Sequence, residues 1–451
     1  MQLTAPMLNE VPTVEARSLR ATKWLLFFAV LFLFNPQFLN LLSLSVPPLR
    51  PWKQVLCLLL YALFLLRFRY LAARIGLSHV AAVRRCIVVS IILVLVLAAR
   101  TVAEGFNLTR ISFAAFFYLA YVPFIMLPLV YLNQGGPRSF FVLFARLGAL
   151  VGAGLILDHF FGFFETFSIG EASDYVASLR KGAEIRRAAF LMEGPNILGY
   201  CVNLCLLCQL YLVFVRSTRP PAKLFYAASA AVLFAGAFLS ASRQVVATAA
   251  FALSVGMLLG ILTRQSGRSR LGPVIVVLVL LPITAYIVRE IVTESEQAMS
   301  VAERLAGGLD EQRLRLWGEG VALFGPSNIA GWFIGEGLGD TMRQKMAADE
   351  SFHHHYESSI FASFHEGGWP LLFALLWPAV AAGLILLKQP KSLLKRLLLV
   401  YVVCSVVLNF VAPTGLHSTA LIAIYSVLGL AMSLPAFLEV ERPPAQGTVE
   451  G

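Results

Sequence analysis

Long apolar runs constrain this chain more than any other feature of its sequence. A run of about 20 apolar residues is long enough to cross the hydrocarbon core of a bilayer as a helix. Hydrophobic residues make up 58% of the chain and charged residues 14%, against about 45–50% and about 25% in soluble domains. The sequence therefore predicts an all-α polytopic membrane protein, with residues 1–451 forming a single transmembrane domain. The expected spans, about twelve in number, are residues 25–46, 54–72, 86–102, 111–132, 140–162, 195–215, 224–241, 244–263, 271–289, 358–387, 397–413 and 417–437.

Lysine and arginine residues indicate which side of the membrane each loop occupies, because short cytoplasmic loops retain them. With the N-terminus inside, the cytoplasmic loops contain no acid and carry Arg67, Arg69, Arg74, Arg84, Arg85, Arg138, Arg216, Arg219, Lys223, Arg264, Arg268, Arg270, Lys388, Lys391, Lys395 and Arg396. The first span has no small-residue cleavage site, so we expect an uncleaved anchor. These flanks near anionic lipid explain the net charge of +11, and no nucleic-acid partner is predicted.

The polar segment Arg289–Glu357 separates two apolar runs and holds twelve of the 25 acidic residues, twice the number of its bases. We predict that residues 290–357 form an extracytoplasmic loop between spans nine and ten. Within it, Asp310 is expected to cap a helix that ends at Phe324 and lies along the membrane surface. The following GWFIGEGLGD lacks the lysine and Ser/Thr of a phosphate-binding loop, so a glycine-rich turn is the better interpretation.

Two arginines and three cysteines near the spans each allow a structural and a functional interpretation. Arg146 lies nearly two turns into span five, where its side chain can extend back to the cytoplasmic interface; the alternative is a functional buried cation. Arg243 stands at a tight outer turn, where topology favours no cation, and it bonds either to headgroups or to a substrate. Cys201, Cys205 and Cys208 share a helix face, which indicates small-residue helix packing more than metal binding.

A histidine cluster stands where the polar loop returns to the membrane. His353, His354 and His355 are consecutive, so they point in different directions and cannot all bind one metal. The next apolar run is interrupted by glycine and proline, and ionisable groups at membrane depth are functional candidates, although a loop histidine is usually just solvated. The ionisable residues beside this interruption are His355, Glu357, His365 and Glu366, and the interrupting residues are Gly367, Gly368 and Pro370.

Four pieces of the sequence, in this order, resemble the O-antigen ligase and O-antigen polymerase superfamily. Together with about twelve spans and a large outer loop, they cover residues 185–370. The pieces are an arginine eight residues before Pro-Asn (Arg187, Pro195, Asn196), a Ser-Arg at a tight outer turn (Ser242, Arg243), an Arg-x-x-x-Trp followed by Gly-x-Gly (Arg313, Trp317, Gly335, Gly337), and a histidine segment leading to Glu-x-Gly (His353–His355, Glu366, Gly368).

The resemblance implies a fold similar to other membrane glycosyltransferases that use polyprenyl-linked sugar donors, the GT-C-like architecture. Members of the family work in the bacterial inner membrane with the active site facing the periplasm. They transfer a glycan from undecaprenyl diphosphate to lipid A core or to another lipid-linked glycan. The expected partners are therefore this donor, a glycan or lipid A-core acceptor and the lipid bilayer.

The residues fit a metal-independent reaction without a cofactor. A sugar-diphosphate leaving group develops charge, which enzymes neutralise with a divalent cation or with arginines. We find no Asp-x-Asp pair in the predicted outer segments, so no metal site is predicted. Arg187, Arg243 and Arg313 fall on the outer face, and their guanidinium forks fit phosphate oxygens. We expect them to bind the donor diphosphate.

The acceptor hydroxyl needs a base that titrates near neutral pH, for which histidine is suited. The family's histidine is often followed by Asn, whereas this chain reads His-His-His-Tyr-Glu-Ser-Ser. His355 is preferred because it lies nearest the returning span, and His354 and His353 stay candidates. If the base is none of these histidines, Glu357, His365 and His417 are the next candidates.

Two other functions share some of these sequence features. A polysaccharide or lipid-linked oligosaccharide transporter would also have many spans and broken helices, but it would not need a structured outer loop of this length. A structural scaffold would not explain the arginines on the outer face. Ligase and polymerase share the donor chemistry, and the sequence does not separate them.

Overall fold

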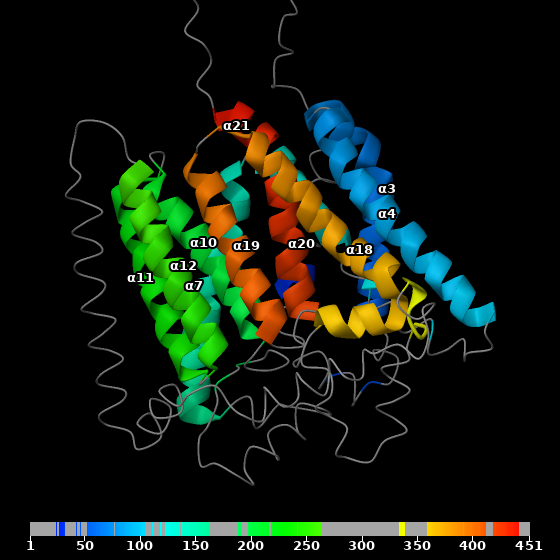
Figure 1. Ribbon diagram of the computed structural model, residues 1–451. Coiled ribbons are helices and arrows are strands. Elements are labelled where there is room, and N and C mark those ends of the chain that lie inside the picture. The colour runs from blue at the N-terminus through cyan, green and yellow to red at the C-terminus, as the bar shows by residue number, and fades with distance from the viewer. Residues whose placement is uncertain are drawn as a thin grey trace, which may run out of the picture.

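The computed structural model describes residues 52–75, 77–103, 122–135, 137–162, 197–215, 218–240, 242–263, 333–338, 359–390, 392–411 and 418–441, together with residues 24, 27–31, 42, 46, 111, 118, 119, 188 and 190. The regular elements of this part of the chain are helices (Figure 1). They are α3 (Trp52–Ile75), α4 (Leu77–Ala103), η2 (Val122–Met126), α6 (Leu127–Gly135), α7 (Pro137–Phe161), α10 (Leu198–Phe214), α11 (Pro220–Leu239), α12 (Arg243–Thr263), α18 (Ser359–Lys388), α19 (Leu393–Val411), α20 (Ser418–Met432) and α21 (Leu434–Glu441).

Helices α4, α7, α11, α12 and α18 are long and apolar enough to cross a membrane. The corresponding stretches are Val80–Val102, Arg138–Phe161, Pro220–Leu239, Gln244–Leu262 and Ser363–Lys388. Shorter apolar helices contribute Val122–Tyr131, Leu198–Phe214 and Ala420–Met432. The chain is thus an all-helical multi-pass membrane protein, as predicted. The total of about twelve spans stays a prediction, because residues 271–289 and most of 25–46 lie outside the described residues.

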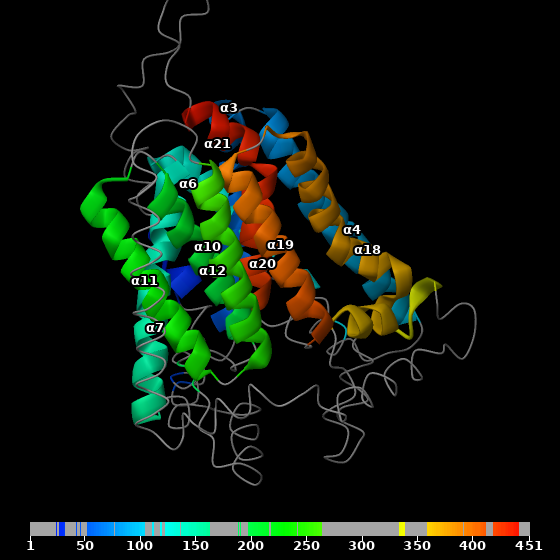
Figure 2. The same cartoon turned by 60° about the vertical axis from the view of Figure 1, so that its left-hand side comes forward.

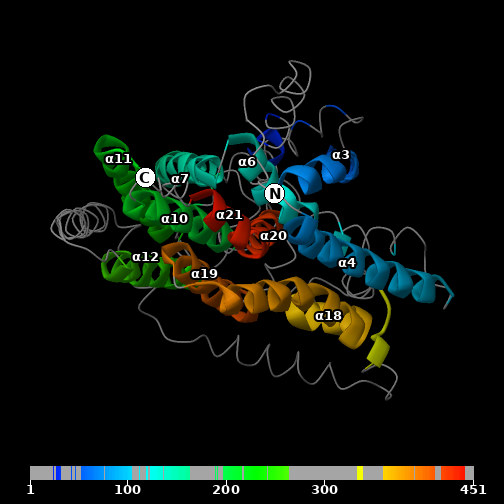
Figure 3. The ribbon, with the colours of Figure 1, turned by 90° about the horizontal axis from the view of Figure 1, so that it is seen from above.

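Helix α10 is the centre of the bundle. Each of its residues from Leu198 to Phe214 is buried, and it packs against α7, α11, α12, α19 and α20. Seen from above, α10 lies between α7 on one side and α12 and α19 on the other (Figure 3). A helix that is apolar on all sides is expected to be enclosed in this way.

Helices α7 and α11 approach each other closely through glycines. A Cβ added at Gly152 would lie 2.7 Å from Leu233 Cα, and one at Gly236 would lie 2.9 Å from the Gly152 carbonyl oxygen. Small residues allow backbones in membranes to pack at such distances. This contact fixes the second halves of α7 and α11 against each other, and the candidate site described below begins at the ends of these helices.

Three predicted spans differ from the structure in detail. The span predicted at residues 86–102 belongs to α4, which begins nine residues earlier, at Leu77. Residues 417–437 were predicted as one span, but the helix is divided at Ser433 into α20 and α21. Pro435 has no N–H to donate within the helix, which favours an interruption here. The predicted span 111–132 is described continuously from Val122, as a 3-10 helix followed by α6.

The two ends of the bundle differ in charge. The connections α3–α4, α6–α7, α10–α11 and α18–α19 lie at one end, uppermost in Figures 1 and 2, and the α11–α12 turn and the start of α18 lie at the other. We call the first the cation-rich end, because its described residues include Arg84, Arg85, Arg138, Arg219, Lys223, Lys388, Lys395 and Arg396. Its assignment to the cytoplasm stays a prediction.

Candidate functional site

The α11–α12 turn lies at the end opposite the cation-rich end and carries the predicted Ser-Arg pair. Helix α11 ends at Leu239 and α12 begins at Arg243. Ser242 is buried; its carbonyl accepts the Val246 N–H at 3.0 Å, and its own N–H donates to Ser240 Oγ at 3.3 Å. The turn is therefore closed by its own serines and sets the backbone of Arg243 at the first position of α12. The side chain of Arg243 lies outside the described residues.

The segment after Arg187 runs against this turn. Ala188 is fully buried, and its N–H donates to the carbonyl of Leu239 at 3.2 Å. Leu239 is separated from Arg243 only by the turn itself. Arg187, the residue before Ala188, lies outside the described residues. The segment that follows one predicted diphosphate ligand and the turn that carries another are nevertheless neighbours, although they are far apart in the sequence.

Asp158 anchors the same segment from α7. Its Oδ2 accepts the Phe190 N–H at 2.7 Å, and the side chain is 1% exposed. Phe190 has a positive φ of 54°, and its ring lies 2.7 Å from where a Cβ on Gly154 would stand. Asp158 was not among the residues that we predicted. The signal for it is an acid inside an apolar run, since such groups in membranes are rare and usually paired.

A second cluster begins at the break in α18. Gly368 has φ 57° and ψ −151°, which interrupts the helix, in agreement with the predicted interruption of this span. The helical donor for the carbonyl of Glu366 would be the residue four positions later, which is Pro370 and has no N–H. This carbonyl therefore needs a partner from another segment.

The glycine-rich turn of residues 333–338 supplies that partner. The Gly337 N–H donates to the Glu366 carbonyl at 3.0 Å, and the Glu336 N–H donates to the His365 carbonyl at 2.7 Å. The turn comes from the polar segment Arg289–Glu357, whereas α18 follows that segment along the chain. The two backbone hydrogen bonds thus attach this part of the polar segment to the break in the helix.

The turn and the break touch backbone to backbone, and this contact requires glycine on both sides. Gly335 has φ 67°, and a Cβ added there would lie 2.5 Å from the Glu366 carbonyl carbon. A Cβ on Gly368 would lie 2.7 Å from Ile334 N. Gly337 also has a positive φ of 115°, as expected of a glycine-rich turn.

Helix α4 holds the turn from its other side. The Arg100 guanidinium donates to the carbonyls of Ile334 and Gly335, the latter at 3.3 Å. Thr101 is buried, and its Oγ1 accepts the Leu338 N–H at 3.2 Å. Arg100 and Thr101 lie near the C-terminal end of α4, so α4 and α18 enclose the turn between them (Figure 1).

The Glu366 side chain lies inside this second cluster. It is 4% exposed, and the Tyr118 hydroxyl donates to its Oε2 at 3.1 Å. Apolar side chains surround the pair, among them Leu97, Leu338 and Leu371. Burying a carboxyl group in such surroundings costs free energy, so this group is a functional candidate. Glu366 was noted in the sequence. Its partner Tyr118 was not predicted, and neither was Arg100, which donates to the turn of residues 333–338.

Most of the predicted site lies outside the described residues. The structure describes Arg243 by its backbone, and it describes His365 and Glu366 with their side chains. The mutual arrangement of the predicted arginines and histidines therefore stays a prediction. The predicted groups outside the described residues are Arg187, Arg313, His353, His354, His355, Glu357, His417 and the helix expected at Asp310–Phe324.

The two described clusters lie at the same end of the bundle but are separate from each other. The end of α19 and the start of α20 stand between the α11–α12 turn and the turn of residues 333–338 (Figures 1 and 3). Within the described residues, His, Cys, Asp and Glu side chains form no group of three or more that is arranged to hold a metal ion.

No protein-family model matches the chain, and no curated protein matches it significantly. What the architecture establishes is therefore its class. This is a multi-pass membrane protein. Its described polar clusters gather at the end of the bundle opposite the cation-rich end.

Proposed function

We propose that this protein is a membrane glycosyltransferase of the O-antigen ligase and polymerase type. It transfers an undecaprenyl-diphosphate-linked glycan to a lipid A-core or other lipid-linked acceptor, on the periplasmic face of a bacterial inner membrane. The observation that supports this most is the hydrogen bond from Ala188 N–H to Leu239. It joins the segment after Arg187 to the turn that carries Arg243, so two separate segments can present guanidinium groups to the adjacent phosphates of one donor.

The proposed reaction uses these groups without a metal. The acceptor hydroxyl oxygen attacks the anomeric carbon, and the bond from that carbon to the diphosphate oxygen breaks. The electron pair leaves with undecaprenyl diphosphate, whose growing charge Arg187 and Arg243 stabilise, with Arg313 closing over it. The hydroxyl proton passes to one of His353, His354 or His355, with His355 preferred.

The attachment of the polar segment to α18 is consistent with this proposal. A transferase that acts on a lipid-linked donor needs the loop residues close to the membrane end where the diphosphate lies. The bonds from Glu336 and Gly337 to the break in α18 hold one point of the segment there. The same segment also carries Arg313, His355 and Glu357 along its sequence, and in the proposed reaction they act at this end of the bundle.

A transporter of lipid-linked oligosaccharide is the second candidate, and the break in α18 favours it. Interrupted helices with an ionisable residue beside the break line the substrate sites of many transporters, and Glu366 lies two residues before Gly368. Purified protein in proteoliposomes separates the two functions. A transferase joins donor glycan to acceptor in detergent, whereas a transporter moves lipid-linked glycan between leaflets without forming a new glycosidic bond.

The roles of the arginines and the histidine are tested by measuring donor affinity and turnover separately. Arg243→Ala should lose donor binding, and Arg243→Lys should lose nearly as much, because a point charge does not reproduce two parallel hydrogen bonds. His355→Ala should lower turnover by about 10² to 10⁴ while donor binding stays intact. Arg219→Ala, which removes a cation from the cation-rich end, is the control and should change neither.

The same assay tests whether arginines replace a metal. Transfer should continue in excess chelator. Loss of transfer in chelator, with recovery on adding magnesium or manganese, would contradict the mechanism. Normal turnover in His355→Ala with weakened donor binding would show that the base is another residue.

A further inference from the structure

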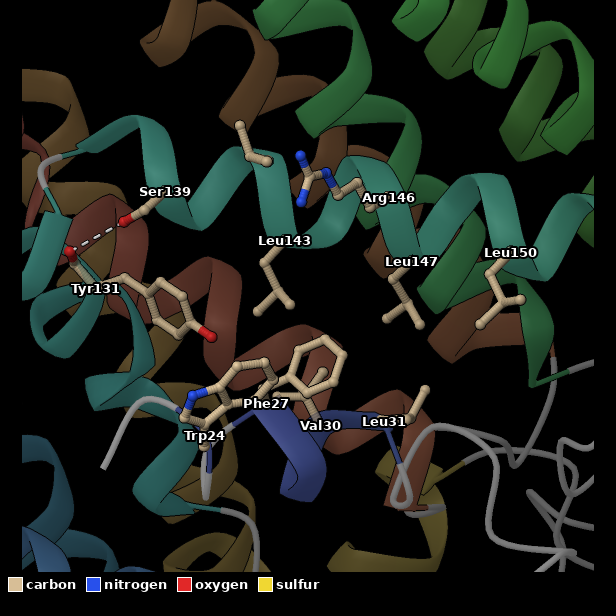
Figure 4. Close-up of a pocket in the computed structure, with 11 residues that line it drawn as sticks. Trp24, Phe27, Val30, Leu31, Tyr131, Ser139, Leu143, Arg146, Leu147 and Leu150 are labelled. Atoms are coloured by element: carbon tan, nitrogen blue, oxygen red, sulfur yellow. Dashed lines mark hydrogen bonds between the residues drawn. The ribbon is translucent and has the colours of Figure 1, made fainter. Parts of the chain in front are cut away.

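An apolar pocket of about 620 Å³ lies between the N-terminal helical residues 27–31 and α7 (Figure 4). Trp24 and Phe27 line it on one side, and Leu143 and Leu147 line it on the other. This pocket belongs to neither of the polar clusters described above. Its α7 lining extends from Ser139 to Leu150, so the pocket lies along the first half of α7, which begins at the cation-rich end of the bundle.

Arg146 is the one charged residue that lines this pocket. Figure 4 shows its guanidinium turned back along α7 toward Ser139, near the start of the helix. Helix α7 has 25 residues, which is roughly 37 Å at 1.5 Å per residue and exceeds a hydrocarbon core of about 30 Å. The first turns of α7 can therefore stand in the interface. A side chain directed toward them reaches the depth of lipid phosphates.

The lining combines a long apolar wall with one cation, whose guanidinium is directed toward the start of α7. The acidic residues of the chain contribute nothing to this lining, all of which is described. The hydroxyl of Ser139 donates to the carbonyl of Tyr131 at 3.2 Å, and the guanidinium is the one charged group in the lining that attracts an anion. An acyl chain with one phosphate complements such a lining in shape and in charge.

We propose that this pocket binds an anionic membrane phospholipid, with one acyl chain between Phe27 and Leu143 and the phosphate on the guanidinium of Arg146. The polar clusters lie at the opposite end of the bundle, so a donor whose diphosphate is handled there does not place its head beside Arg146. The occupant is therefore a lipid of the leaflet at the cation-rich end. Trp24, which is 59% exposed, is covered by this lipid, and the lipid links the first predicted span to α7.

Quenching of tryptophan fluorescence by brominated lipid tests the proposal in the full-length protein. The protein is reconstituted in phosphatidylcholine nanodiscs that contain increasing fractions of phosphatidylglycerol with brominated acyl chains. Quenching should saturate at a lower fraction of brominated phosphatidylglycerol than of brominated phosphatidylcholine. Trp24→Phe should remove that preferential component, because bromine quenches an indole on contact.

Arg146→Gln should lower the apparent affinity for phosphatidylglycerol about tenfold, as expected for the loss of charge-assisted hydrogen bonds. Arg138→Gln removes the same charge from the same helix outside the pocket lining and should keep the preference. Leu143→Phe narrows the pocket without adding a second indole and should lower the preference, while its elution and thermal unfolding in phosphatidylcholine show that it is folded.

Three results would overturn the proposal. They are equal preference for phosphatidylglycerol in wild type and Arg146→Gln, loss of preference in Arg138→Gln to the same degree, and Arg146-dependent binding of undecaprenyl phosphate without binding of phosphatidylglycerol. The last result would identify a polyprenyl lipid as the occupant.

Discussion

At the scale of single residues, glycines decide whether the polar segment can attach to the membrane helix. Gly335 and Gly368 both have φ in the left-handed region, where a Cβ is strained. Each also stands where a Cβ would approach backbone atoms of the other segment within 3 Å. Two independent penalties therefore act on a side chain at either position.

Replacing either glycine should destabilise the protein. Gly335→Ala and Gly368→Ala are each expected to cost about 2 kcal/mol or more, because the strain of a positive φ and the backbone clash add. The thermal unfolding midpoint of purified protein in detergent measures the loss. Gly383→Ala is the matched control in the same helix, since a Cβ there meets nothing within 4 Å; an equal loss in the control would contradict the explanation.

At the scale of elements, the end of α4 acts as a clamp on the turn of residues 333–338. The hydrogen-bond acceptors of Arg100 are not part of α4, because its guanidinium donates to the carbonyls of Ile334 and Gly335. The Thr101 hydroxyl donates to the Leu97 carbonyl at 2.7 Å and accepts a hydrogen bond from the Leu338 N–H. The turn is thus held by side chains of one helix and by the broken backbone of another.

Removing the clamp should destabilise the attachment of residues 333–338 and leave the stability of the helical bundle nearly unchanged. Arg100→Gln and Thr101→Val should each weaken the attachment by about 1–3 kcal/mol, since each removes a partner of a buried backbone group. Hydrogen exchange at residues 333–338 should become roughly 5- to 150-fold faster, with little change in α10. Thr101→Ser keeps the hydroxyl and should exchange as wild type does.

A control for charge is available on the same helix. Arg85→Gln removes a cation from the other end of α4, where Arg85 is exposed and its Nε donates to the carbonyl of Ala81 at 3.4 Å. It should leave exchange of the turn unchanged. Faster exchange across the whole chain in Arg100→Gln would show a general loss of stability and would argue against a local clamp.

At the scale of the whole molecule, the bundle sorts its charges to its two ends. The cations of the short connections share one end, and the polar clusters share the other (Figure 2). Such sorting is what insertion with the cations in the cytoplasm produces. It agrees with the proposed placement of the site on the periplasmic face.

Cysteine labelling in intact cells tests this orientation. A membrane-impermeant maleimide should label Glu357→Cys and should not label Arg268→Cys or Lys388→Cys until the membrane is permeabilised. The six native cysteines are all buried free thiols, so their background should be low. Labelling at positions 268 and 388 with protection at 357 would reverse the whole orientation.

The sequence by itself determined those features that depend on residues close to one another along the chain. The length of an apolar run sets whether a helix can cross the bilayer, which is why α7, α11, α12 and α18 were expected within four residues of their observed bounds. The start of α4 was placed at residue 86, whereas the helix begins at Leu77. Local chemistry likewise predicted the interruption of α18 near Gly368 and the tight turn before Arg243. These properties follow from dihedral freedom and hydrophobicity within a few residues.

What only the tertiary structure decided was which distant groups satisfy one another. A buried donor or acceptor needs a partner, but nothing in its local sequence says which segment provides it. The pairs Asp158 with Phe190, Ala188 with Leu239, and Tyr118 with Glu366 all join segments that are far apart or separated by a helix end. Packing of whole helices brings them together, because a polar group placed in an apolar bundle is stable only where another helix or loop completes its hydrogen bonds.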